Sequence, residues 1–145
     1  MRRHAGFTMV ELLVVIAILG IMSATALPLY RTFQQRAYGS EATLMLKRIL
    51  DAEIMYFLEN ETFFPNGSTI SIYHNDDPGK AEISQIKDAI KITIPVGHFL
   101  DFTITADANI CSVTISSPQN SFPLFKNGDP FITGTVDATG KTDIL

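Results

Sequence analysis

A single glutamate, Glu11, interrupts an otherwise uncharged apolar run near the start of the 145-residue chain. The run covers residues 7–29, and two basic residues, Arg2 and Arg3, precede it. A charged side chain is costly inside a membrane, so an ionisable group within such a run marks a functional site by default. The type and position of Glu11 therefore point to charge pairing within a membrane or an assembly, rather than to catalysis.

The amino-terminal segment has three physical interpretations. A secretory signal peptide needs a small-residue cleavage site after a short apolar stretch, and residues 23–26 could supply one. A plain membrane anchor needs about 20 apolar residues, and residues 7–29 are long enough. In the third interpretation, a short basic leader is cleaved before the apolar run, and the run remains on the mature chain.

The residues around the start of the run favour the third interpretation. Gly6 is followed directly by Phe7, and Glu11 comes four residues after the phenylalanine. This pattern resembles the cleavage motif of type IV prepilins, and Pro28 lies where such pilins often carry a proline near the end of the span. The resemblance covers about residues 6–60. It implies cleavage between Gly6 and Phe7 by a prepilin peptidase, followed by N-methylation of Phe7.

The same resemblance implies a role for Glu11 in subunit assembly. Its carboxylate would pair with the amino terminus of Phe7 on a neighbouring subunit of a filament. The physics agrees, because a carboxylate in hydrocarbon needs a partner and an ammonium group is such a partner. The alternative is that Glu11 lies near the membrane interface and reaches toward the headgroups. That alternative explains why the charge is tolerated, but not why a Gly-Phe junction accompanies it.

Helical spacing continues beyond the apolar run. Apolar residues recur near helical intervals from Phe33 to Phe57, and charged residues, including Glu53, occupy other positions. We expect one helix over about residues 8–58, roughly 75 Å long, with a kink at Pro28 and a second flexible point at Gly39. Its first half is apolar all round, and its second half is amphipathic.

The remainder of the chain alternates in the manner of strands. Residues 59–65 resemble the aromatic-proline turn that follows the long helix of many pilins. After this turn the pattern predicts a short helix at residues 81–90 and strands at residues 69–73, 91–94, 99–105, 110–116 and 131–137.

The expected fold class is α+β, with a long N-terminal helix packed on a C-terminal antiparallel sheet. The expected divisions are a leader, a transmembrane or filament-core helix, an amphipathic continuation of that helix, and a small β-rich head. They cover residues 1–6, 7–29, 30–58 and 59–145.

Composition argues against several other classes of protein. The formal net charge is −4 and no basic stripe is present, so we predict no nucleic-acid partner. The one cysteine, Cys111, cannot form an intrachain disulfide, which departs from the many pilins that carry one. Its strand-like surroundings predict a buried core thiol.

No enzyme signature is found in the sequence. The three histidines, His4, His74 and His98, are scattered along the chain. Three carboxylates could contribute to a calcium loop, but their spacing fits no EF-hand pattern; they are Asp129, Asp137 and Asp143. We therefore expect no catalytic residue, no cofactor and no metal site.

The sequence is best interpreted as a structural subunit of a type IV pilus. The resemblance implies a precursor in the inner membrane and then an extracellular filament. The implied partners are identical or related pilin subunits, the prepilin peptidase, the pilus assembly platform and the lipid of the inner membrane. The alternatives are a periplasmic pseudopilin of a type II secretion system and a minor or DNA-uptake pilin. A membrane-anchored binding module that never polymerises would require neither the Gly-Phe junction nor Glu11.

Overall fold

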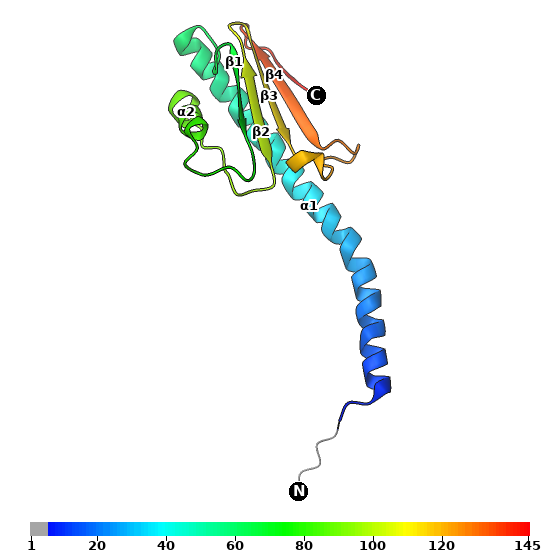
Figure 1. Cartoon of the computed structure of the whole chain (residues 1–145). Coiled ribbons are helices and arrows are strands. Elements are labelled where there is room, and N and C mark those ends of the chain that lie inside the picture. The colour runs from blue at the N-terminus through cyan, green and yellow to red at the C-terminus, as the bar shows by residue number, and fades with distance from the viewer. Residues whose placement is uncertain (1–5) are drawn as a thin grey trace. The chain divides into compact units, whose positions relative to one another are not determined.

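The computed structural model describes residues 6–145, so nearly all of the expected leader, residues 1–6, lies outside the described residues. The chain forms two compact units, Met1–Gln34 and Gln35–Leu145, which are considered separately below. One long helix, α1 (Met9–Asn60), contributes residues to both units (Figure 1). The expected long N-terminal helix is thereby confirmed.

The first unit exposes its apolar side chains. Residues 6–33 are all exposed, and α1 is long and apolar enough there to cross a membrane. Pro28 lies inside the helix, and the Thr32 hydroxyl donates a hydrogen bond to the Pro28 carbonyl oxygen over 3.0 Å. Because this unit does not bury its own apolar surface, lipid or other protein molecules must cover it.

The second unit contains an antiparallel sheet of five strands in the order β1-β2-β3-β4-β5. The strands are β1 (Ser68–Ile72), β2 (Asp101–Ala106), β3 (Ile110–Ser116), β4 (Phe131–Asp137) and β5 (Thr142–Ile144). The short helix α2 (Ala81–Ile90) connects β1 to β2 and lies beside β1 (Figure 1). A single 3-10 turn, η1 (Pro118–Asn120), follows β3. The α+β fold expected from the sequence is confirmed.

One strand assignment made from the sequence is wrong, and one strand was missed. Residues 91–94 form no strand, because Lys91 leaves α2 in the left-handed conformation and Ile94 enters the core without pairing. The apolar residues in this segment reflect the burial of Ile94, and the backbone does not pair with a strand. Strand β5 was not predicted. Its three residues are all exposed, and they form a strand only by pairing with β4.

The core lies between the second half of α1 and the inner face of the sheet. Alternate strand residues point inward, and the helix contributes a stripe that includes Leu46, Ile49 and Leu50. Gly134 in β4 allows the helix to approach, since a Cβ atom there would lie 2.7 Å from a terminal methyl of Leu50. Cys111 on β3 is fully buried in this core, as the sequence predicted.

The burial of Glu53 differs from the pattern expected for the helix. As a charged residue it was expected among the polar positions, but its side chain is 0% exposed. It follows Leu46, Ile49 and Leu50 at intervals of seven, four and three residues, which puts all four on one helical face. The helical spacing of this position therefore predicts burial, whereas its charged side chain predicts exposure.

The loop between β3 and β4 is attached to α1 at Gly39. A Cβ atom at Gly39 would lie 2.3 Å from the carbonyl oxygen of Leu124, so only glycine leaves room for this loop. The Gln35 amide donates a hydrogen bond to the carbonyl oxygen of Phe125. The ring of Tyr38 packs against the ring of Phe122, with centroids 5.7 Å apart. Gly39 therefore serves a close contact rather than acting only as a flexible point.

Candidate functional site

The predicted cleavage junction lies immediately before α1. Gly6 and Phe7 are outside regular secondary structure, and the Phe7 side chain is 82% exposed. A Cβ atom added at Gly6 would meet no atom within 4 Å. The peptide bond between these residues is therefore open to an approaching enzyme.

Thr8 and Glu11 form a reciprocal cap at the start of α1. Glu11 Oε2 accepts hydrogen bonds from the Thr8 backbone N–H at 2.9 Å and from the Thr8 hydroxyl at 2.7 Å. In return, the Glu11 backbone N–H donates to Thr8 Oγ1 over 3.2 Å. This is a capping box, in which two otherwise unpaired N–H groups at a helix start are satisfied.

The role of Thr8 was missed in the sequence analysis, although a signal was present. A threonine followed three residues later by glutamate, just before an apolar run, is the sequence signature of this cap. The signature explains where α1 begins, and it gives Glu11 a partner within its own chain.

One oxygen of the Glu11 carboxylate remains available. The cap uses Oε2, and within residues 6–145 no hydrogen bond or ion pair engages Oε1. A cation could therefore bind Oε1 without displacing the cap. The start of a helix also carries partial positive charge, which favours a carboxylate there and disfavours an ammonium group without a partner.

The remaining predicted site residue, Pro28, lies farther along α1 and is exposed. It forms no part of the arrangement around Gly6, Phe7 and Glu11. The helix continues through it, and the expected kink stays a prediction.

Two of the histidines considered as possible ligands each lie beside a single carboxylate. His74 Nδ1 is 2.9 Å from a carboxylate oxygen of Asp101, and His98 Nε2 is 3.1 Å from one of Glu41. His4 lies outside the described residues. Among the residues that are described, no group of three or more His, Cys, Asp or Glu side chains could hold a metal ion.

The second unit contains one buried carboxyl group, which the sequence analysis did not single out. Glu53 Oε2 accepts a hydrogen bond from the Phe64 backbone N–H at 3.0 Å, and Oε1 is buried without a partner. Burial raises the pKa of Glu53 to about 7, against the opposing effect of the Phe64 hydrogen bond. Burial also raises the pKa of the Cys111 thiol, as does the nearby charge of Glu53. Cys111 is therefore an unreactive core thiol.

Comparison with known proteins identifies the amino-terminal motif. Residues 1–27 match the family described as the prokaryotic N-terminal methylation motif. The chain is 41% identical over 61 residues to the type IV major pilin protein PilA of Myxococcus xanthus. This match covers 42% of this chain and 28% of the relative. It is 34% identical over 105 residues to a fimbrial protein of Neisseria meningitidis serogroup B, covering 72% of this chain and 57% of the relative.

A longer match extends into the sheet. The chain is 29% identical over 120 residues to the type IV major fimbrial protein FimA of Dichelobacter nodosus, covering 80% of this chain and 68% of the relative. The first relatives are matched over much less of their own length, 28% for the Myxococcus protein and 42% for a fimbrial protein of Neisseria meningitidis serogroup A. No solved structure matches the chain at a comparable level.

Proposed function

We propose that the chain is a member of the type IV pilin family and a structural subunit of a type IV pilus filament. The observation that carries the proposal is the arrangement at the start of α1. An open Gly6–Phe7 junction precedes a capped carboxylate that retains one available oxygen, and an uncovered apolar helix follows.

In the proposed pathway, a prepilin peptidase removes residues 1–6 and methylates the new amino terminus at Phe7. Residues 7–29 hold the precursor in the inner membrane and later form the filament core. Residues 30–58 continue the helix, with a kink at Pro28 just before them, and residues 59–145 form the head. The further partners are the assembly platform and other copies of this chain or related pilins.

The capping box supports a specific account of the pairing between subunits. After cleavage, the ammonium group of Phe7 would stand one residue before the cap, at the positive end of its own helix. It therefore gains from a carboxylate, and Glu11 of a neighbouring subunit can offer Oε1 while Oε2 maintains the neighbour's cap. In low-dielectric surroundings such a pair is favourable only when both charges are well hydrogen-bonded, and the cap contributes to that condition.

The exposed apolar surface supports polymerisation. Large apolar side chains along the first unit are more than two-fifths exposed, including Val15 at 44% and Ile21 at 69%. Lipid covers such a surface in a membrane, and adjacent helices must replace the lipid when the subunit leaves it. A filament built around these helices meets that requirement, which supports a structural role.

The remaining alternatives are a periplasmic pseudopilin of a type II secretion system and a minor or DNA-uptake pilin. Both would use the same amino-terminal arrangement. The relatives are named as pilins and fimbrial proteins, which favours the pilus.

We expect the membrane-extracted protein to begin at methylated Phe7. Mass analysis of its amino-terminal peptide checks this, and Gly6→Glu should leave the precursor uncut because the side chain blocks the junction. His4→Ala changes the leader but keeps the junction, and it should be processed normally. A mature terminus near Ala26 would instead identify an ordinary secretory signal peptide and contradict the proposal.

A further inference from the structure

The outer face of the sheet is built from hydroxyl side chains. Inward positions are apolar, whereas the outward positions in the middle of β1 to β4 are serine or threonine throughout. They pair across the strands in two adjacent rows, Ser71–Thr103–Thr114–Thr133 and Thr69–Thr105–Ser112–Thr135. This part of the face carries hydroxyl groups and no charge.

Hydrogen bonds across the strands hold several of these hydroxyls in place. Thr69 and Thr105 are 2.9 Å apart through their hydroxyl oxygens, and Thr114 and Thr133 are 3.0 Å apart. Each hydroxyl has one donor and two acceptor positions, so a pair that shares one hydrogen bond can still bind a further polar molecule. The face therefore presents oriented groups that both donate and accept.

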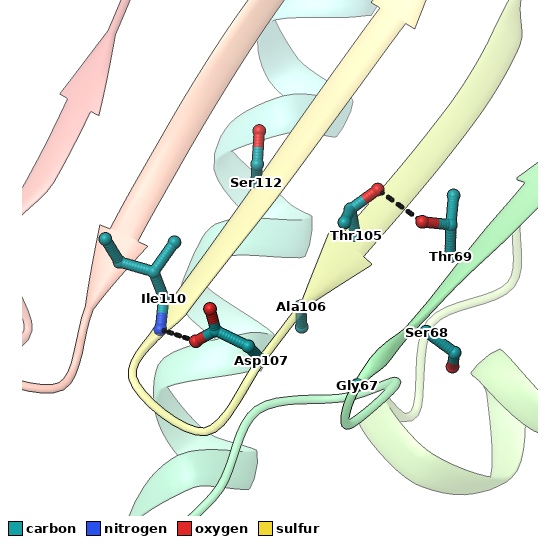
Figure 2. A pocket seen from close by; sticks show the side chains of 8 residues that line it. All are labelled: Gly67, Ser68, Thr69, Thr105, Ala106, Asp107, Ile110 and Ser112. Carbon is teal, nitrogen blue, oxygen red and sulfur yellow. Dashed lines mark hydrogen bonds between the residues drawn. The ribbon is translucent and has the colours of Figure 1, made fainter.

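One end of the second row opens into a hollow of about 280 Å³. Figure 2 shows the Thr69–Thr105 pair on one side and Asp107 with Ile110 on the other. The lining also includes Ser68 and Ser112. The hollow is open to solvent and lies across β1, β2 and β3.

Asp107 supplies the only charge in the lining. Its Oδ1 accepts hydrogen bonds from the backbone N–H groups of Asn109 at 2.8 Å and Ile110 at 2.9 Å, and these bonds hold the pKa of the carboxyl below its usual range. The carboxylate is therefore ionised and fixed in orientation. Among residues 6–145, no hydrogen bond occupies Oδ2.

These features narrow the class of ligand. An anion would be repelled by Asp107, and no basic side chain lines the hollow to offset that repulsion. A metal ion would require several carboxylate or carbonyl ligands, and the hollow offers one carboxylate. A wholly apolar molecule would leave the serine and threonine hydroxyls without partners.

A sugar satisfies each of these conditions. Its hydroxyls can donate to Asp107 and exchange hydrogen bonds with Thr105 and Ser112, while its C–H surface can contact the exposed side chain of Ile110. We propose that this hollow binds one neutral sugar unit, with the rows of hydroxyls accommodating further units of an oligosaccharide. The proposal concerns the head alone, and it does not depend on whether the chain polymerises.

The test uses the full chain solubilised in detergent. Binding is measured by saturation-transfer NMR and calorimetry with neutral oligosaccharides of glucose, mannose and N-acetylglucosamine, each beside its monosaccharide. Polygalacturonate oligomers serve as the anionic probe. We expect a neutral oligosaccharide to bind more tightly than its monosaccharide, and the anionic oligomers not to bind.

Two variants with matched controls locate the site. Asp107→Asn keeps an oxygen that can accept the turn hydrogen bonds but removes the charge, and Thr105→Val removes one hydroxyl. Each should weaken binding, by about tenfold for Asp107→Asn, because hydrogen bonds to charged groups are the stronger ones. Asp137→Asn changes a similar turn aspartate, and Ser40→Ala removes an exposed hydroxyl from α1; both lie outside the hollow and outside the rows of hydroxyls and should bind as the wild type does.

Three outcomes would overturn the assignment. The first is that no neutral saccharide binds, and the second is that the anionic oligomers bind as tightly as the neutral ones. The third is equal loss of binding in the control variants. If Asp107→Asn disturbs the turn, Thr105→Val and Ser112→Ala decide the question, since neither changes a backbone interaction.

Discussion

Glu11 has one carboxylate for two roles, one observed in its own helix and one proposed between subunits. The oxygen that caps α1 belongs to the local geometry of the helix start, and the other oxygen is the one proposed to pair with a neighbouring subunit. The two roles can be separated by substitution, because glutamine also functions in a capping box but carries no charge.

We expect Glu11→Gln to insert into the membrane normally but to lower the yield of sheared filaments more than tenfold, since the neighbouring ammonium loses its partner. Thr8→Ala is the matched control, because it removes the cap at a cost of about 1 kcal/mol and keeps the charge. Its filament yield should stay near that of the wild type. Equal loss in both variants would assign the defect to helix capping and not to charge pairing.

The buried carboxyl of Glu53 predicts that the stability of the second unit depends on pH. Its pKa is raised from 4.5 to about 7 in the folded chain, so the folded state favours the protonated form. The contribution to stability is fully present below the unfolded pKa of 4.5 and is lost as pH rises through about 7. The loss amounts to about 3 kcal/mol.

Denaturant unfolding from about pH 4 to about pH 8 measures this effect as the difference between the wild type and Glu53→Gln. The subtraction removes the opposite trend from the aspartates with lowered pKa values, such as Asp76 and Asp137. Across this pH range, we expect the free energy of unfolding of Glu53→Gln to rise by about 3 kcal/mol relative to that of the wild type. Glu59→Gln, at an exposed position, should show no such change, and a constant difference for Glu53→Gln would contradict the prediction.

At the scale of elements, glycines determine how closely the helix meets its neighbours. Gly134 lets Leu46 and Leu50 rest against the middle of β4, and Gly39 lets the loop before β4 touch the backbone of α1. Both positions lie inside regular elements, where glycine itself lowers stability. Their presence is therefore explained by packing and not by conformational preference.

Gly39→Ala should destabilise the second unit by up to about 3 kcal/mol, because the new Cβ atom would meet the Leu124 carbonyl oxygen at 2.3 Å. Thermal unfolding of disassembled subunits in detergent measures the effect. Gly20→Ala is the control in the same helix, since a Cβ atom there meets nothing within 4 Å and alanine is the better helix former. A stable Gly39→Ala variant would show that the loop moves aside at little cost.

At the scale of the whole chain, the two units differ in whether their apolar side chains are exposed or buried. The first leaves its apolar side chains uncovered, whereas the second buries a core shared by α1, α2 and the sheet. Cys111 is the only cysteine and is buried, so packing rather than a disulfide stabilises this second unit. Its fold should therefore not depend on redox conditions.

A chain that begins at Gln35 should be soluble and should unfold cooperatively, with the same midpoint in the presence and absence of reductant. Cys111→Ser should lower its stability by about 1–3 kcal/mol, because a hydroxyl replaces a thiol in an apolar site. Urea unfolding followed by circular dichroism checks both expectations. A midpoint that falls on adding reductant would reveal a disulfide between chains and contradict the buried-thiol assignment.

Local patterns in the sequence were enough to predict the main elements. The apolar run predicted the first part of α1, and alternation predicted most of the sheet, because both signals depend on residues close together in the chain. The capping signature of Thr8 and Glu11 is equally local and was available to be found. The predicted junction at Gly6 and Phe7 rests on a signal of the same kind, a short linear motif.

Only the tertiary structure decided the features that join distant segments. Strand β5 exists through its pairing with β4, and Gly39 is needed because a loop from the other end of the head lies against it. Glu53 is buried because a full helical face meets the sheet, which overrides the preference of one charged side chain for water. The hollow beside Asp107 likewise arises from the register of three strands, and register is a property of pairing that no single segment encodes.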